Sequence, residues 1–224
     1  VVLDERTVAM IHGCGGPLVF AYASFLAFAS SADWKESRPA IESKGLWRVS
    51  WILLIATIVQ LVLGAQLRHA LPNTTPRGFM TAVHLHLTFA AVVTVLILAV
   101  SAIIRTGEYA RFRSLRTPAN ALLALLAVQL ALGFGTWFVN YALPWSEWFP
   151  TAANYVISAK GYWESMIVTA HQATGSLMIC LAVWLISRIG PRRIPLALSR
   201  PRSTIPQSTA TDAVRDTIST GPAI

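Results

Sequence analysis

Histidines near the ends of long apolar runs are the residues in this sequence best suited to chemistry. His171 lies in an uncharged run over residues 165–187, and Gly175 follows one helical turn later. An imidazole in a membrane is costly to leave without a partner, so His171 is a candidate functional residue. The small residue leaves the helix face beside the ring open, and a flat ligand such as an iron porphyrin could fit there. The alternative is that His171 hydrogen-bonds a neighbouring helix and Gly175 serves helix packing.

The same pattern, a histidine with a small residue four positions later, occurs twice more. His12 is followed by Gly16 in the segment HGCGG, and His86 is followed by Ala90 in HLTFA. His84 and His86 lie about 200° apart around a helix, so only one of them can point at a shared site. The small residue favours His86 as the ligand, and His84 remains the alternative.

Five uncharged apolar runs must position these histidines. Hydrophobic residues make up 54% and charged residues 12% of the chain, and the mean hydropathy is +0.55. This composition excludes a soluble domain and predicts an all-α, multi-pass membrane helix bundle. The net charge of +8 does not indicate nucleic-acid binding, because most Lys and Arg lie between the runs. The runs cover residues 8–30, 49–67, 78–104, 118–141 and 165–187.

The segments that join these runs alternate in their content of Lys and Arg. The segments after the first, third and fifth runs are basic, and the other two hold few basic residues. By the positive-inside rule, the basic segments and the C-terminus are cytoplasmic. His12, His86 and His171 then lie at a similar depth in the outer half of a protein of the cell inner (plasma) membrane.

Two segments outside the runs have a distinctive composition. The segment before the fifth run contains Trp145, Trp148 and Trp163, which are typical of a membrane interface belt. The alternative is a lid over an outward-facing pocket. Residues 189–224 are rich in Pro, Ser, Thr and Arg and lack apolar periodicity, which predicts a disordered cytoplasmic tail.

A unit of two helices occurs twice in the chain, and each copy ends in a run that contains a histidine. The segment QLVLG runs from Gln60 to Gly64, the segment QLALG runs from Gln129 to Gly133, and each precedes a histidine-bearing run. We interpret the glutamines as interhelical hydrogen-bonding residues and the glycines as sites of close helix approach. Both are therefore assigned to the scaffold.

Cations in the outer segment between the second and third runs complete the candidate site. Arg68 and Arg77 lie at the level where the anionic propionates of a haem would need a partner. Their alternative role is to anchor the helices at the membrane interface.

The order of motifs IHGCGG, QLVLGAQLRH, HLHLTFA, QLALGFGTW and AHQATGSL resembles the second half of the haem A synthase family. That family has eight transmembrane helices in two similar four-helix halves. The resemblance implies that residues 1–30 are the last helix of an incomplete first half. Residues 46–188 would be the four-helix haem-binding second half, and residues 189–224 the tail.

The resemblance also implies a function. Family members convert haem O to haem A by oxidising a ring methyl to a formyl group, for the assembly of terminal oxidases. A haem b would be held by His86 and His171, and His12 would belong to the first-half site where the substrate haem reacts. The family commonly has Arg after the sixth-helix histidine, where this chain has Leu87. The implied metal ligands are therefore His86, with His84 as the alternative, His171 and His12.

The resemblance leaves partners and two other function classes open. Expected partners are the lipid bilayer, the haem substrate, haem O synthase or oxidase assembly proteins, and a second copy of the chain, with no nucleic acid. The alternatives are a b-type electron-transfer cytochrome and a non-catalytic haem-binding assembly factor. Because the partner histidine of the first-half site would lie upstream, we expect residues 1–224 alone to be inactive as a synthase.

Overall fold

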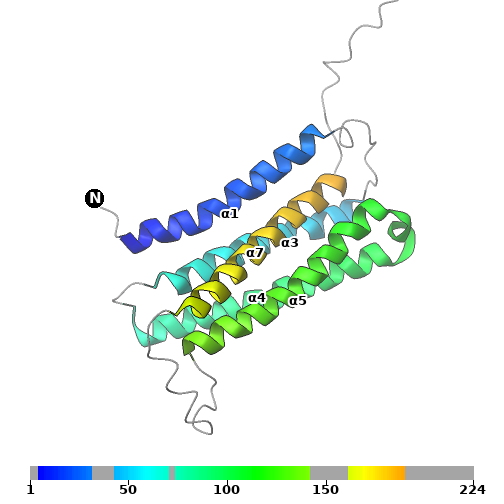
Figure 1. The fold of residues 1–224 in the computed structure, drawn as a ribbon. Helices are drawn as coiled ribbons and strands as arrows, with labels where there is room; N and C mark the ends of the chain where they lie inside the picture. The colour runs from blue at the N-terminus through cyan, green and yellow to red at the C-terminus, as the bar shows by residue number, and fades with distance from the viewer. Residues whose placement is uncertain (1–4, 32–42, 71–73, 142–160, 190–224) are drawn as a thin grey trace, which may run out of the picture. The chain divides into compact units, whose positions relative to one another are not determined.

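The computed structural model describes residues 5–31, 43–70, 74–141 and 161–189. In these ranges the chain forms five long α-helices and one short 3-10 helix, and no strand (Figure 1). Each long helix has the length and hydropathy to cross a membrane. The predicted all-α, multi-pass membrane helix bundle is therefore confirmed. The elements are α1 (Glu5–Ser30), α3 (Lys44–Arg68), α4 (Pro76–Arg105), η1 (Gly107–Arg111), α5 (Arg113–Tyr141) and α7 (Tyr162–Ile189).

Every helix begins before the uncharged run that predicted it, because the first turn of each helix contains a charged residue. The hydroxyl of Ser43 caps α3 by accepting a hydrogen bond from the backbone N–H of Leu46. Thr75 caps α4 in the same way, and Pro76 follows at the first helical position, where its missing N–H costs nothing. These capping residues lie outside the uncharged runs, so a search for apolar residues alone misses them.

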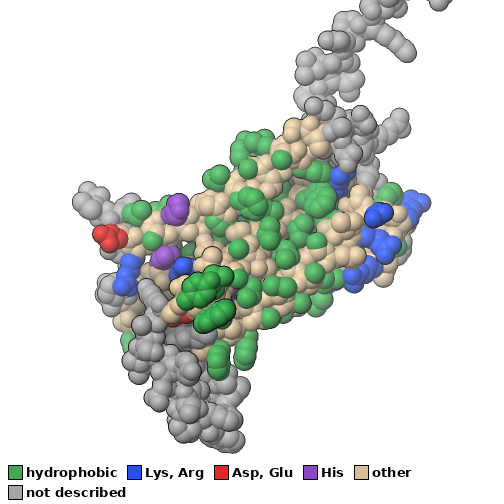
Figure 2. Space-filling model, in the orientation of Figure 1, with side chains coloured by type: hydrophobic (Ala, Val, Ile, Leu, Met, Phe, Trp, Pro, Cys, Tyr) green, Lys and Arg blue, Asp and Glu red, His purple; other side chains and the backbone are tan. Residues whose placement is uncertain are grey.

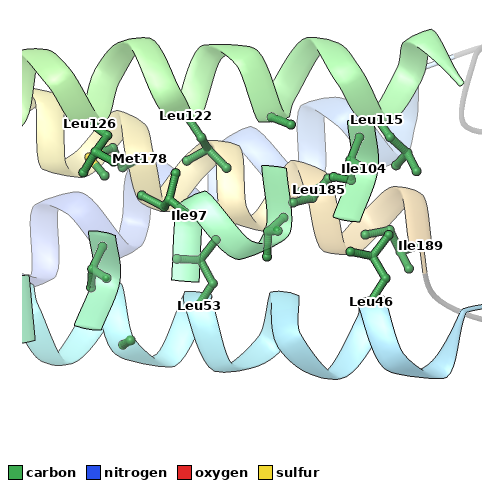
Figure 3. Close-up of a cluster of buried hydrophobic side chains, with 14 residues drawn as sticks. Leu46, Leu53, Ile97, Ile104, Leu115, Leu122, Leu126, Met178, Leu185 and Ile189 are labelled. Carbon is green, nitrogen blue, oxygen red and sulfur yellow. The ribbon is translucent and has the colours of Figure 1, made fainter. Parts of the chain in front are cut away.

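Four of the helices, α3, α4, α5 and α7, surround the main core of the bundle (Figure 3). The core residues recur along each helix at spacings of three, four or seven residues, which places them on one face. Small residues such as Ala119 let the helix backbones approach closely, and close packing is what holds helices together in lipid. Fully buried side chains of this core include Leu46, Leu53, Ile97, Ile104, Leu115, Leu122 and Leu185.

Helix α1 lies outside this four-helix core. It contacts α7 and α3, and through Ala21 it joins a second, smaller cluster with Leu54, Ile179 and Ala182. Contacts nevertheless group Val1–Pro191 into one compact unit. The assignment of α1 to a different half of a longer protein therefore stays a prediction.

The two ends of the bundle differ in charge. Basic side chains gather where α1 and α7 end, and histidines lie toward the opposite end (Figure 2). The first end carries Lys44, Arg48, Arg105, Arg111, Arg113, Arg116 and Arg188, and the opposite end carries Arg6, Arg68 and Arg77.

Some of the predicted features fall on other parts of the chain. Trp145, Trp148 and residues 190–224 lie outside the described residues. Trp163 is in the first turn of α7, and its side chain is exposed.

Candidate functional site

The two repeated helix pairs each bring a glutamine to a histidine. In the α3–α4 pair, Nε2 of Gln60 lies 3.2 Å from Nδ1 and 3.3 Å from Nε2 of His86. In the α5–α7 pair, Nε2 of Gln129 lies 3.4 Å from Nε2 of His171. Each amide N–H can donate to an unprotonated ring nitrogen. The predicted interhelical hydrogen bonds are confirmed, and their partners are the candidate ligands themselves.

The glycine of each QLxLG segment receives the histidine ring. A Cβ built on Gly64 would lie 3.2 Å from Cε1 and 3.7 Å from Nδ1 of His86, and Gly133 gives the same two distances to His171. Glutamine and glycine are one helical turn apart, so both face the same neighbouring helix. The predicted close approach at the glycines is confirmed, and the two helix pairs have matching local geometry.

These matched pairs place two imidazoles near each other inside the bundle. His86 and His171 are both partly buried, and they lie close enough to interact electrostatically. Three polar atoms around them are buried and have no hydrogen-bond partner among the described residues: Oε1 of Gln60, Oε1 of Gln129 and Nδ1 of His171. Buried polar atoms are normally paired, so this region has unused hydrogen-bonding capacity.

The small residues beside the histidines have different surroundings. A Cβ built on Gly175 would lie 3.3 Å from Nε2 of Gln129, so the space beside Gly175 receives this amide. That contact explains why a small residue follows His171 by one turn. Ala90, at the equivalent position after His86, is partly buried, and its carbonyl accepts a hydrogen bond from Thr94. The role of both residues as ligand contacts stays a prediction.

The other two candidate histidines are exposed. His84 lies on a different face of α4 from His86, and its Nδ1 is 2.7 Å from the Met80 carbonyl of its own helix. His12 is exposed on α1, and a Cβ built on Gly16 would meet no atom of the described residues within 4 Å. Thus the face of α1 that carries His12 and Gly16 is open, whereas His86 faces the bundle.

A polar network at the same end of the bundle was not foreseen from the sequence. Gln172, the residue after His171, donates from Nε2 to the carbonyl of Gly13 and accepts from Nη1 of Arg68, both at 3.3 Å. It therefore joins α1, α3 and α7 beside the histidine site. The sequence contains two residues that could have indicated this contact: Gln172 directly follows His171, and Gly13 directly follows His12.

The predicted cations lie at the rim of this region. Arg68 is exposed and contributes one nitrogen to the network, and Arg77 is exposed in the first turn of α4. At the same end of the bundle, Nη1 of Arg6 donates a hydrogen bond to the carbonyl of Ala70 at 2.5 Å. Arg68 and Arg77 thus lie at the end of the bundle that carries the histidines, and their pairing with propionates stays a prediction.

The residues present fit a bis-imidazole iron site of the kind that haem uses. Two neutral imidazoles from different helices can each offer a ring nitrogen to iron. The donor set and the unpaired buried atoms around it are compatible with this use. The described residues contain no group of three or more His, Cys, Asp or Glu side chains that could hold a metal ion. His86 and His171 are therefore the candidate iron ligands of this site.

The fold and these paired histidines define a multi-pass membrane helix bundle with a candidate bis-histidine site. Comparisons with protein-family models, with curated proteins and with solved structures give no match.

Proposed function

We propose that this chain is a membrane oxidoreductase of the haem A synthase type that holds a haem b between His86 and His171. The observation that carries the proposal is the matched geometry of the two pairs, in which His86 and His171 each rest on a glycine and contact a glutamine. The particular reaction, the conversion of haem O to haem A, is proposed from the resemblance of the motif order to the haem A synthase family.

The residues of the chain would ligate and orient the haem. Helices α4 and α7 each present one imidazole, and the rings are restricted by Gly64 and Gly133 on the helices before them. At His171 the nitrogen that contacts Gln129 is Nε2, a ring nitrogen that can ligate iron. On haem binding, this nitrogen would lose its contact with the Gln129 amide and ligate the iron instead. The surrounding apolar helices would exclude water from the site.

When bound, haem b would supply one-electron transfer. The implied reaction oxidises a ring methyl of haem O to a formyl group, which removes four electrons and adds one oxygen atom, so it requires an electron acceptor and an oxygen source in addition to these residues. His12 would ligate the substrate haem on the open face of α1, together with a ligand from outside the described residues. Arg68 and Arg77, both exposed at the same end, would pair with propionates.

The proposed location follows from the charge difference between the two ends of the bundle. The end with Arg105, Arg113 and Arg188 would face the cytoplasm, and the histidines would face outward across the inner (plasma) membrane. The chain would then contact its partners within the same membrane. These partners would be haem O synthase, oxidase assembly proteins or a second copy of the chain.

A b-type electron-transfer cytochrome is the second candidate. It is favoured by one observation: the paired site on α4 and α7 has two histidines, whereas His12 is exposed on an open helix face. Such a protein would use His86 and His171 and would need no substrate haem.

The test uses the purified full chain in detergent. We expect a six-coordinate, low-spin haem b spectrum that is lost in His86→Ala and in His171→Ala and kept in His84→Ala. Loss of the spectrum in His84→Ala, with retention in His86→Ala, would reject the assignment of ligands. A normal haem b spectrum together with no spectral change on addition of haem O, in the unmodified chain as in His12→Ala, would favour the electron-transfer cytochrome.

A further inference from the structure

A groove lies between α1 and α7 in the half of these helices nearest the basic end. Its volume is about 280 Å³. The hydroxyls that line it are already hydrogen-bonded: Ser24 donates to the Phe20 carbonyl, and Ser187 donates to the Val183 carbonyl. The rest of the lining is apolar or aromatic, with one thiol. The lining residues are Ser24, Phe25, Phe28, Cys180, Leu181, Val183, Trp184 and Ser187.

A cation lies beside the groove. The guanidinium carbon of Arg188 is 4.5 Å from the centroid of the Phe28 ring, which lines the groove. Arg188 is partly buried, and its Nε is buried without a hydrogen-bond partner among the described residues. Of the described acidic residues, Glu5 and Glu164 lie at the opposite end of the bundle, and Glu108 is exposed on η1 at the basic end. None of these three carboxylates forms an ion pair with Arg188. The charge of Arg188 is therefore available to an anion.

An indole N–H lies one turn deeper on the same helix face. Trp184 precedes Arg188 by four residues, so the two side chains are neighbours on α7. Its ring packs 6.0 Å from Phe28, and its Nε1 is buried without a hydrogen-bond partner among the described residues. A buried indole N–H normally has an acceptor. The groove thus combines an apolar surface, a deeper donor and a cation at its end.

We propose that this groove binds an anionic phospholipid of the surrounding membrane. The phosphate would pair with Arg188, an ester carbonyl one turn deeper would accept from Nε1 of Trp184, and one acyl chain would lie along Phe25 and Leu181. Basic sites between transmembrane helices are a known means of binding anionic headgroups. The assignment does not depend on the haem proposal.

The position and charge of the groove favour a lipid over other occupants. Helix α1 has only two buried residues, Pro17 and Ala21, and toward its basic end it exposes large apolar side chains such as Tyr22 and Leu26. In a membrane this part of α1, away from His12, faces acyl chains. A soluble anion would use Arg188 alone and would leave the apolar groove and Trp184 unexplained.

The proposal is tested by fluorescence quenching in vesicles of phosphatidylcholine that contain a minor fraction of phosphatidylglycerol. The full chain is reconstituted with bromine on the acyl chains of one lipid or the other, and the Trp184 signal is obtained by subtracting the Trp184→Phe variant. We expect brominated phosphatidylglycerol to quench this signal several-fold more, per mole of lipid, than brominated phosphatidylcholine.

Charge variants complete the experiment. Arg188→Gln should remove the preference for phosphatidylglycerol, and Arg188→Lys should keep most of it. Arg116→Gln, which removes an exposed cation at the same end, is the matched control and should leave the preference unchanged. Equal quenching by the two lipids, no quenching by either, or a preference that survives Arg188→Gln would each overturn the assignment.

Discussion

Gly133 and His171 approach so closely that a Cβ on the glycine would lie 3.2 Å from Cε1 of the imidazole. Gly64 and His86 repeat this relationship at the same distance in the other helix pair. Each glycine therefore sets both the separation of two helices and the position of a candidate iron ligand. The internal sequence repeat is thus a repeat of local geometry.

Alanine at Gly133 or Gly64 should destabilise the bundle and displace the histidine. The added methyl overpacks the helix contact, which costs about 1–3 kcal/mol, and the better helix propensity of Ala returns at most about 1 kcal/mol. We expect a lower thermal midpoint in detergent and reduced haem occupancy in both variants.

Gly15→Ala is the matched control for these glycine variants. It adds the same methyl within helix α1, at a position where a Cβ would meet nothing within 4 Å in the described part of the chain. Its thermal midpoint should equal or exceed that of the unmodified chain. Equal effects of Gly15→Ala and Gly133→Ala would show that the close contact with His171 is not important.

Replacing Gln129 by Ala should affect the haem-free form more than the haem-bound form. The amide contacts Nε2 of His171 when no iron is bound, and interhelical hydrogen bonds in membranes contribute about 0.6 kcal/mol on average. We expect a small decrease in thermal midpoint for haem-free protein, with haem content after reconstitution retained. Complete loss of haem content in Gln129→Ala would contradict the proposal that Nε2 of His171 leaves the Gln129 amide to ligate the iron.

Gln172→Ala should loosen α1 from the remainder of the bundle. It removes one hydrogen bond to the Gly13 carbonyl and one from Arg68, and α1 has few other buried residues. Spin labels on α1 and α7 should report a broader distance distribution than in the unmodified chain. Gln66→Ala, at an exposed position of α3, is the control and should leave the distribution narrow.

The sequence predicted the fold well because length and hydropathy determine a transmembrane helix almost completely. The apolar runs located all five long helices of the described chain, and the errors were confined to ends. Ser43 and Thr75 are the N-caps of α3 and α4. Because they are polar, a search for apolar runs places the start of each helix too late. The short helix η1 was also missed, since a few polar residues between two spans carry no hydropathy signal.

The candidate site was predicted less completely. A repeated Gln and Gly at helical spacing was enough to predict interhelical contacts, but not that His86 and His171 would be the partners. Contacts of Gln172 could not be predicted, because they depend on how α1 and α7 are placed together. The contact between Gly175 and Gln129 was not predicted either, and the role of Gly175 as a ligand contact stays a prediction.

The C-terminus should lie in the cytoplasm. Basic side chains are concentrated at the end of the bundle where α7 finishes, and cytoplasmic segments carry the excess of Lys and Arg. A reporter active only in the cytoplasm should work when fused after residue 224, and a single cysteine placed at Trp163 should react with an impermeant reagent from outside. The reverse pattern would place His86 and His171 toward the cytoplasm and would remove the proposed outward site.

Residues 1–224 alone should bind haem b without converting haem O to haem A. A reactive site must ligate the substrate and supply groups that transfer protons. His12 is exposed on α1, and the position of Gly16 beside it meets no atom within 4 Å, so the described residues leave this face uncovered. His86 and His171 would be committed to haem b. The measurement is haem analysis of cells that lack any other synthase and express this chain, with the His12→Ala variant as a control. Haem A in those cells that disappears in His12→Ala would show that these five helices already contain the reactive site.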